Sequence, residues 1–221
     1  MEHKFEEGLR LLQLHFIGKI LAGFSHEIKN YLAIIKESAG LMEDLIKLGK
    51  ASESDSGQNL EIIHSIEEQI EKANTLFRYL NRFAHRMDDQ FTTFNVNESL
   101  EELAALVTRF ANQKKISIEK DFHEAIPPVY SNPSLLQFVV YSVLEEKIRN
   151  LDKNSKIAIQ TGVDENSVRI RIVPEGNFVQ GEGDTTLISY KILEKIVMQL
   201  GGNILQESGR ETLIMLPLTN S

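Results

Sequence analysis

The sequence LHFIGKILAGFSHEIKNYLAIIKESAGLMEDL, residues 14–45, decides the fold because its apolar side chains recur at alternating steps of three and four residues. This spacing is a heptad repeat and predicts a long amphipathic helix. Ser38 is the one polar residue at a seam position. The apolar seam positions are Leu14, Ile17, Leu21, Phe24, Ile28, Tyr31, Ile35, Met42 and Leu45.

A second heptad seam follows a polar stretch, KASESDSG at residues 50–57, which predicts a loop. Two long helices joined by a short loop form an antiparallel hairpin, but two narrow apolar stripes cannot enclose a core alone. We therefore expect a homodimer in which two hairpins form a four-helix bundle. The second seam consists of Ile63, Ile66, Ile70, Ala73, Phe77, Leu80, Ala84 and Met87.

From residue 92 onward, strand-like and helix-like patterns alternate, which predicts an α/β sandwich with one helical layer. The overall class is α+β, with a helical hairpin over residues 1–91 and the sandwich over residues 92–221. Strands are predicted at 94–97, 116–122, 156–161, 167–173, 203–206 and 212–216, helices at 98–113, 133–150 and 185–200, and a Gly-rich loop at 175–184.

The composition narrows the classes of partner. Lys and Arg number 24 against 32 Asp and Glu, so the net charge of −8 opposes nonspecific attraction to nucleic acid or anionic lipid. The chain has no cysteine, and its first residues, MEHKFEEGLR, lack the pattern of a secretory signal. No apolar run is long enough to cross a membrane. We expect a cytoplasmic protein with neither nucleic acid nor membrane as a partner.

His26 falls at the outermost heptad position if Leu21 and Ile28 face the core. Small or polar residues share its face, and a partner protein is expected to contact them. Gly23 suggests close approach, because glycine inside a helix costs about 1 kcal/mol relative to alanine. The predicted partner-binding residues are Lys19, Ala22, Gly23, Lys29 and Ala33.

An exposed histidine suits phosphoryl transfer because its neutral imidazole is nucleophilic near pH 7. Glu27 is placed to hold or deprotonate the ring. Asn30 lies one helical turn further on, where its amide can contact a phosphoryl oxygen or position a water. We predict that these three residues carry the chemistry. The string His-Glu-x-x-Asn is not the zinc motif, because that motif needs a second histidine where Asn30 stands, so no metal is assigned.

The stretch FSHEIKNYLAII, residues 24–35, resembles the H-box of bacterial sensor histidine kinases, with Tyr31 where that family usually has proline. The order of elements after residue 92 resembles the family's ATP-binding domain. Residues 129–140, VYSNPSLLQFVV, resemble the approach to its N-box. The two N-box asparagines are replaced here by Tyr141 and Glu145.

Two further nucleotide motifs of that family are also altered. The Asp-x-Gly-x-Gly turn is replaced by PEGNF at residues 174–178, and the second Gly-rich turn by TTLISY at 185–190, with Gly181 and Gly183 nearby. The resemblance therefore implies a degenerate domain that does not bind ATP. We predict no cofactor for this chain and expect Mg²⁺ to be held by a partner receiver domain.

The resemblance implies a histidine phosphotransferase that relays phosphoryl groups between receiver-domain aspartates through His26. Its partners would be response regulator receiver domains and a hybrid histidine kinase, docking in a shallow groove between the bundle and the second domain. Three alternatives stay open: a phosphatase of a phosphorylated response regulator that uses Glu27 and Asn30, a non-catalytic kinase-binding adaptor, and an active histidine kinase with an atypical ATP site.

Overall fold

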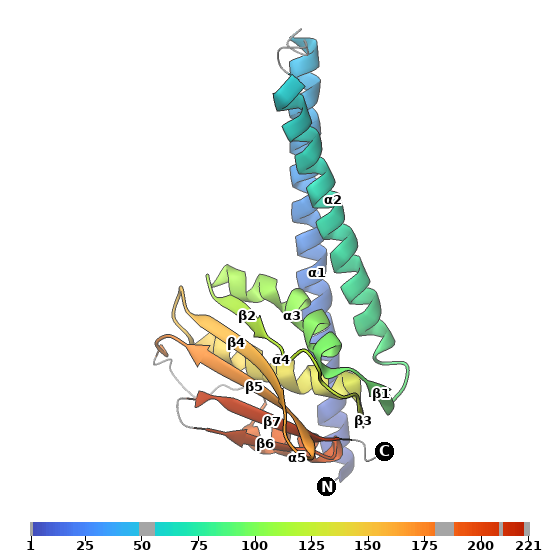
Figure 1. Cartoon of the computed structure of the whole chain (residues 1–221), viewed down its shortest axis with the longest axis vertical. Coiled ribbons are helices and arrows are strands. Elements are labelled where there is room, and N and C mark those ends of the chain that lie inside the picture. Colours follow the sequence, from blue (N-terminus) through green and yellow to red (C-terminus); the bar gives the residue numbers. More distant parts are fainter. Residues whose placement is uncertain (1, 49–55, 180–187, 208–209, 219–221) are drawn as a thin grey trace.

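Two long helices form the hairpin in the computed structural model, which describes residues 2–48, 56–179, 188–207 and 210–218. Helix α1 (Glu2–Lys47) and helix α2 (Ser56–His85) lie side by side and antiparallel (Figure 1). Most of the loop predicted at 50–57 lies outside the described residues. Among the helices described, none has both the length and the hydropathy needed to cross a membrane.

The second part is an α/β sandwich with its helices on one face of a sheet, as predicted (Figure 1). The five-stranded sheet has the order β2-β4-β5-β7-β6, in which only the β2–β4 pair is parallel. A two-stranded antiparallel pair, β1–β3, lies apart from it. The elements are β1 (Thr92–Phe94), α3 (Val96–Gln113), β2 (Ser117–Asp121), β3 (Val129–Ser131), α4 (Pro133–Asn150), β4 (Lys156–Val163), β5 (Ser167–Glu175), α5 (Tyr190–Gln199), β6 (Asn203–Gln206) and β7 (Thr212–Pro217).

Two predicted boundaries need correction. The strand predicted at 94–97 ends at Phe94, because the Asn95 side chain accepts a hydrogen bond of 3.2 Å from the Glu98 backbone N–H and so caps helix α3. The helix predicted from residue 185 begins at Tyr190 in the described part, and residues 185–187 lie outside it. Strand β3 had not been predicted.

The sheet buries one face against the helices. Alternate residues of β4 and β5 are buried, among them Ile157, Ile159, Ile170 and Ile172, which is the period of a half-buried strand. They join the same apolar cluster as residues of α3 and α4.

The N-terminal half of α1 also packs into this core. The residues that make this contact are not those of the predicted seam. Phe16 is 3% exposed, and its ring centroid lies 5.5 Å from that of Phe83 on α2, 5.7 Å from Phe138 and 4.6 Å from Tyr141 on α4. One turn further along α1, Ile20 is fully buried. The aromatic cluster therefore joins both hairpin helices to the second part of the chain.

A buried ion pair crosses the same junction at the end of α2. Glu102 of α3 has no exposed side-chain surface, and its carboxylate accepts from Arg86 Nε at 3.2 Å and Nη2 at 3.0 Å. Gln137 of α4 donates to the same carboxylate at 3.3 Å. Such a buried carboxylate is tolerated only with its partners in place. The boundary predicted between residues 91 and 92 thus separates two segments that share one core.

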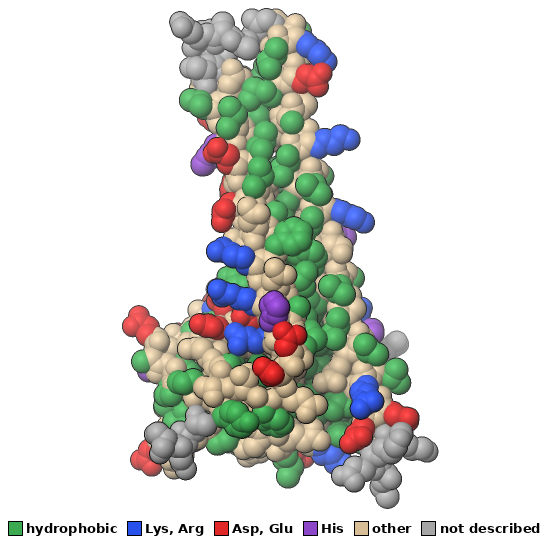
Figure 2. Space-filling model, turned by 90° about the vertical axis from the view of Figure 1, so that its right-hand side faces the viewer, with side chains coloured by type: hydrophobic (Ala, Val, Ile, Leu, Met, Phe, Trp, Pro, Cys, Tyr) green, Lys and Arg blue, Asp and Glu red, His purple; other side chains and the backbone are tan. Residues whose placement is uncertain are grey.

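The register of the buried stripe on α2 differs from the predicted seam. The buried positions are Ile62, Gln69, Leu76 and Phe83. Helix α2 packs against both α1 and α3. The predicted seam residues Ile63, Ile70 and Phe77 are 44%, 45% and 47% exposed. Figure 2 shows hydrophobic side chains along most of the hairpin, between rows of charged ones. A single chain therefore leaves an apolar stripe uncovered.

Replacing Phe16 with alanine tests whether the hairpin and the sandwich fold as one unit. We expect Phe16→Ala to lower the free energy of unfolding by about 3–5 kcal/mol and to shift a single transition, because the cavity opens in a shared core. Urea unfolding followed by circular dichroism measures this. The control is Met198→Ala at an exposed position of α5, expected to change stability by about 0.5 kcal/mol or less. Separate transitions for helix and sheet would contradict the shared core.

Candidate functional site

His26 is exposed on α1, about midway along that helix. The neighbouring residues Lys19, Ala22, Lys29 and Ala33 are exposed too. These positions fit the predicted outward face, and their contact with a partner stays a prediction. Helix α1 continues unbroken through Tyr31, as expected for a chain without the usual proline.

Glu27 is the centre of a hydrogen-bonded group beside His26. Its Oε2 accepts from Asn30 Nδ2 at 3.3 Å and from Arg109 Nη1 of α3 at 3.2 Å. The Tyr31 hydroxyl donates to the same carboxylate. Burial, followed by the charge of Glu27 and this hydrogen bond, raises the pKa of Tyr31. Glu27 and Asn30 are thus brought together as predicted, whereas Arg109 and Tyr31 had not been assigned a role.

Gly23 corrects the predicted partner surface. It is buried, and a Cβ added to it would lie 2.7 Å from Cζ of Phe110 on α3. The close approach that this glycine permits is therefore made within the chain, by α3. Phe24 packs edge-on against Phe77 of α2, with 4.9 Å between the ring centroids.

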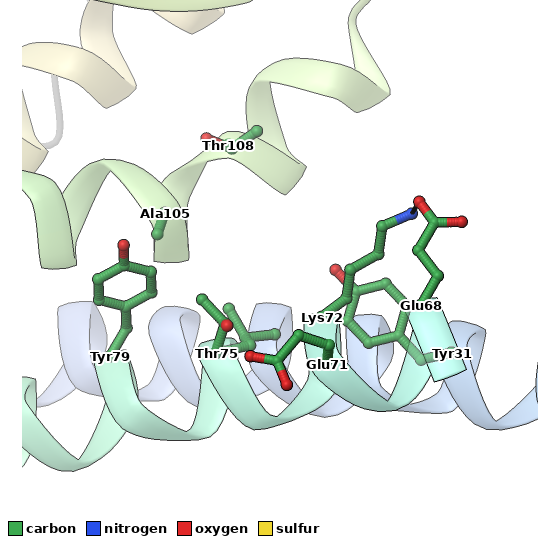
Figure 3. A pocket seen from close by; sticks show the side chains of 9 residues that line it. Tyr31, Glu68, Glu71, Lys72, Thr75, Tyr79, Ala105 and Thr108 are labelled. Atoms are coloured by element: carbon green, nitrogen blue, oxygen red, sulfur yellow. Dashed lines mark ion pairs between the residues drawn. The ribbon is translucent and has the colours of Figure 1, made fainter. Parts of the chain in front are cut away.

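A groove of about 370 Å³ opens between the hairpin and α3, next to this group (Figure 3). The Tyr31 ring lies at one end, close to the ion pair of Glu68 and Lys72, and Tyr79 lies at the other. A smaller pocket that also includes Glu27 and Arg109 adjoins it through shared residues. The groove is lined by Tyr31, Glu68, Glu71, Lys72, Thr75, Leu76, Tyr79, Ala105 and Thr108. The expected groove between hairpin and second domain is present.

The two positions where the N-box asparagines would stand bond with each other. The buried Tyr141 hydroxyl donates to the Glu145 carboxylate, and both burial and that carboxylate raise the pKa of Tyr141. The Glu145 Oε2 atom also lies 3.8 Å from Nη2 of Arg149. The Tyr141 ring is part of the aromatic cluster with Phe16. These two side chains therefore serve packing and mutual hydrogen bonding in the described structure.

The segment in place of the Asp-x-Gly-x-Gly turn folds back onto the connection between α4 and β4. The backbone of Phe178 pairs with that of Leu151, and the Asp152 N–H donates to the Asn177 carbonyl at 3.0 Å. The Arg210 guanidinium lies 4.0 Å from the centre of the Phe178 ring. Gly181, Gly183 and residues 185–187 lie outside the described residues.

Sequence reasoning missed Arg109 and Phe110, the two residues by which α3 meets the histidine helix. Both lie in the helix predicted at 98–113, for which no contact with the histidine helix was predicted. The available signal was a second apolar stripe on α1, at Phe5, Leu9, Leu12, Phe16 and Ile20, which shows that this helix has two packing faces.

Comparison with known proteins agrees with this arrangement. No protein-family model matches the chain. It is 25% identical to sporulation kinase E of Bacillus subtilis over 97% of its own length and 30% of that protein. It is 21% identical to the signal transduction histidine-protein kinase AtoS of Escherichia coli, over 67% and 23% of the two chains. The catalytic domain of histidine kinase ThkA covers 60% of this chain with a TM-score of 0.50 and 20% identity.

The chain therefore has a sensor histidine kinase-like core, a helical part followed by a sheet domain that resembles the ATPase domain of those kinases. Its sequence is thus similar to part of two histidine kinases. The chain spans less than half the length of the curated relatives that it matches.

Two glycines of α1 provide a matched test of the contact with α3. Gly40 has no atom within 4 Å of its added Cβ, so Gly40→Ala should gain up to about 1 kcal/mol of stability from helix propensity. Gly23→Ala should not gain this stability, because its Cβ would clash with Phe110. Adding Phe110→Leu to Gly23→Ala should restore part of the stability, because the leucine side chain is shorter. Urea midpoints of the variants measure the difference. Equal midpoints for the two alanine variants would show that α3 does not press on Gly23.

Proposed function

We propose that the chain is a histidine phosphotransferase of a two-component phosphorelay, with His26 as the phosphoacceptor. The observation that carries this proposal is an exposed His26 beside Glu27 and Asn30 on one helix, next to a groove formed with the second domain. Exposure allows the imidazole to reach an aspartyl phosphate on another protein. The N–P bond that forms is reactive enough to pass the group onward.

The first step takes place between a phosphorylated receiver domain and this chain. The bond between the receiver's aspartate and phosphorus breaks, a bond between phosphorus and the His26 nitrogen forms, and the imidazole gives up a proton. In the second step a receiver carboxylate attacks the same phosphorus, the N–P bond breaks, and the imidazole takes up a proton again. Mg²⁺ held by the receiver would offset the phosphoryl charge. The proposed partners are response regulator receiver domains and a hybrid histidine kinase, and the proposed location is the cytoplasm.

Transfer from another protein is favoured over autophosphorylation by the altered nucleotide motifs. Tyr141 and Glu145 stand where the N-box asparagines would, and Pro174 replaces the adenine-binding aspartate inside strand β5. Each of these motifs would supply a separate part of an ATP site. An active kinase is supported chiefly by the names of the relatives, and an assay with ATP separates the two activities.

A phosphatase is the second candidate, because Asn30 is held by Glu27 on the turn next to His26. An amide so fixed is suited to positioning a water against a receiver's aspartyl phosphate. In that reaction the phosphoryl group leaves as inorganic phosphate without forming a bond to His26.

The assay uses purified receiver domains from the same genome, each labelled with radioactive acetyl phosphate. We expect one of them to transfer its label to this chain, His26→Ala to abolish labelling, and His64→Ala, at an exposed position of α2, to leave it unchanged. Labelled ATP with Mg²⁺ should give no label.

Other outcomes of this assay choose between the alternatives. Loss of receiver label with His26→Ala still active would indicate a phosphatase. Label from ATP would indicate a kinase. Tight kinase binding without any transfer would indicate an adaptor.

We also propose that two chains pair through the uncovered stripe of the hairpin. Besides Ile63, Ile70 and Phe77, the predicted seam residues Leu14 and Leu21 are 64% and 46% exposed. An apolar stripe of this length on a soluble protein marks an interface. A second copy presents the same stripe, so a two-fold pair covers both.

A charge in this stripe should separate the pair. We expect the wild-type chain to sediment as a dimer and Ile70→Asp to sediment as a monomer with its helix content retained, because Ile70 is already half exposed in one chain. Met198→Asp, on α5, is the control and should stay dimeric. A wild-type monomer at tens of micromolar would rule out this pairing.

A further inference from the structure

Two neighbouring residues of α3 reach the histidine helix at positions just before and just after His26 in the sequence. Phe110 packs over Gly23, and Arg109 bonds to Glu27, one helical turn further along α1. The missing side chain at Gly23 lets α3 come close enough for Arg109 to reach the carboxylate. The second domain therefore contributes directly to the surroundings of the phosphoacceptor.

The ion pair between Arg109 and Glu27 is largely shielded from solvent. The Arg109 side chain is 13% exposed and that of Glu27 is 29% exposed, with 3.2 Å between Nη1 and Oε2. Shielding weakens the screening that makes most surface ion pairs ineffective. Since Arg109 is mostly covered, it is badly placed to bind an incoming protein and well placed to hold Glu27.

Holding Glu27 also fixes Asn30. The Glu27 Oε2 that Arg109 contacts is the same oxygen that accepts from Asn30 Nδ2. The Asn30 amide is thereby turned with its nitrogen toward Glu27, and its oxygen remains available on the side away from that bond. Arg109, Glu27 and Asn30 form a chain of contacts that ends one turn from His26.

We propose that Arg109 is a positioning residue of the phosphoacceptor site, supplied by the second domain and acting through Glu27 on Asn30. This proposal rests on the proposed transfer at His26 and gives the ATPase-like domain a part in it. The domain that has lost its nucleotide motifs then serves as a fixed support for the histidine helix.

The test compares transfer rates from a labelled receiver for Arg109→Ala, Arg109→Lys, Glu27→Ala and the double variant Glu27→Ala/Arg109→Ala. Arg109→Ala should lower the maximal rate roughly 10-fold or more, since lost positioning has effects of this order. The receiver concentration that gives half the maximal rate should change by less than about twofold, because Arg109 does not bind the receiver. Arg109→Lys should recover part of the rate.

The double variant separates positioning from general stabilisation. If Arg109 acts through Glu27, the double variant should transfer at the rate of Glu27→Ala alone. Arg169→Ala is the control. Arg169 lies on β5, and its Nε is 3.0 Å from Asp164 Oδ2. The transfer rate of this variant should match that of the wild-type chain. Additive losses in the double variant, or a wild-type rate for Arg109→Ala, would overturn the proposal.

A readout independent of transfer keeps this proposal distinct from the proposed function. In NMR spectra the Asn30 side-chain amide, assigned by its loss in Asn30→Asp, should shift in Arg109→Ala and remain in place in Arg169→Ala. If the wild-type chain accepts no phosphoryl group from any receiver, the proposed relay function is wrong. The NMR resonances alone then decide whether Arg109 positions Asn30. An Asn30 amide unchanged in Arg109→Ala would then refute the positioning role.

Discussion

The packing of α1 against α3 and α4 is the contact on which the rest of the structure depends. Phe16 and Ile20 are buried, with Phe16 packed against aromatic rings of α2 and α4, and about one turn beyond Ile20 Gly23 admits Phe110. Without this contact the hairpin would be two narrow stripes and the sandwich would expose part of its own core. The same contact sets the height at which α3 meets the helix, and so places Arg109 beside Glu27 rather than elsewhere along it.

In the proposed transfer from another protein, the second domain does not have to carry ATP to His26. A kinase must bring the γ-phosphate to the imidazole, and that demands a domain free to approach it. Here the junction carries an aromatic cluster, a buried Arg86–Glu102 pair and the contact of Arg109 with Glu27. Breaking the buried pair alone would leave an uncompensated carboxylate, which is typically costly by several kcal/mol. The arrangement favours a single relative placement of the two parts.

Much of the fold followed from local pattern, and the exceptions have physical causes. Helix 133–150 and strand 203–206 were predicted with their observed bounds. In the structure Asn132 caps this helix, and Gly201-Gly202 precede the strand. The strand predicted through Val96 failed because the Asn95 cap was not recognised. His26, Glu27 and Asn30 were predicted as site residues from one continuous motif. Gly23 was misjudged and Arg109 missed, because heptad spacing describes pairing between helices and carries no information about a third helix from 80 residues further along the chain.

The length of α1 has a consequence for what can lie next to His26. From His26 to Lys47, where α1 ends, the helix rises about 32 Å at 1.5 Å per residue. A folded domain of about 100 residues has a radius of gyration of about 13 Å, and so a diameter of similar size to that rise. The stretch of α1 beyond His26 is thus about as long as one small globular domain is wide.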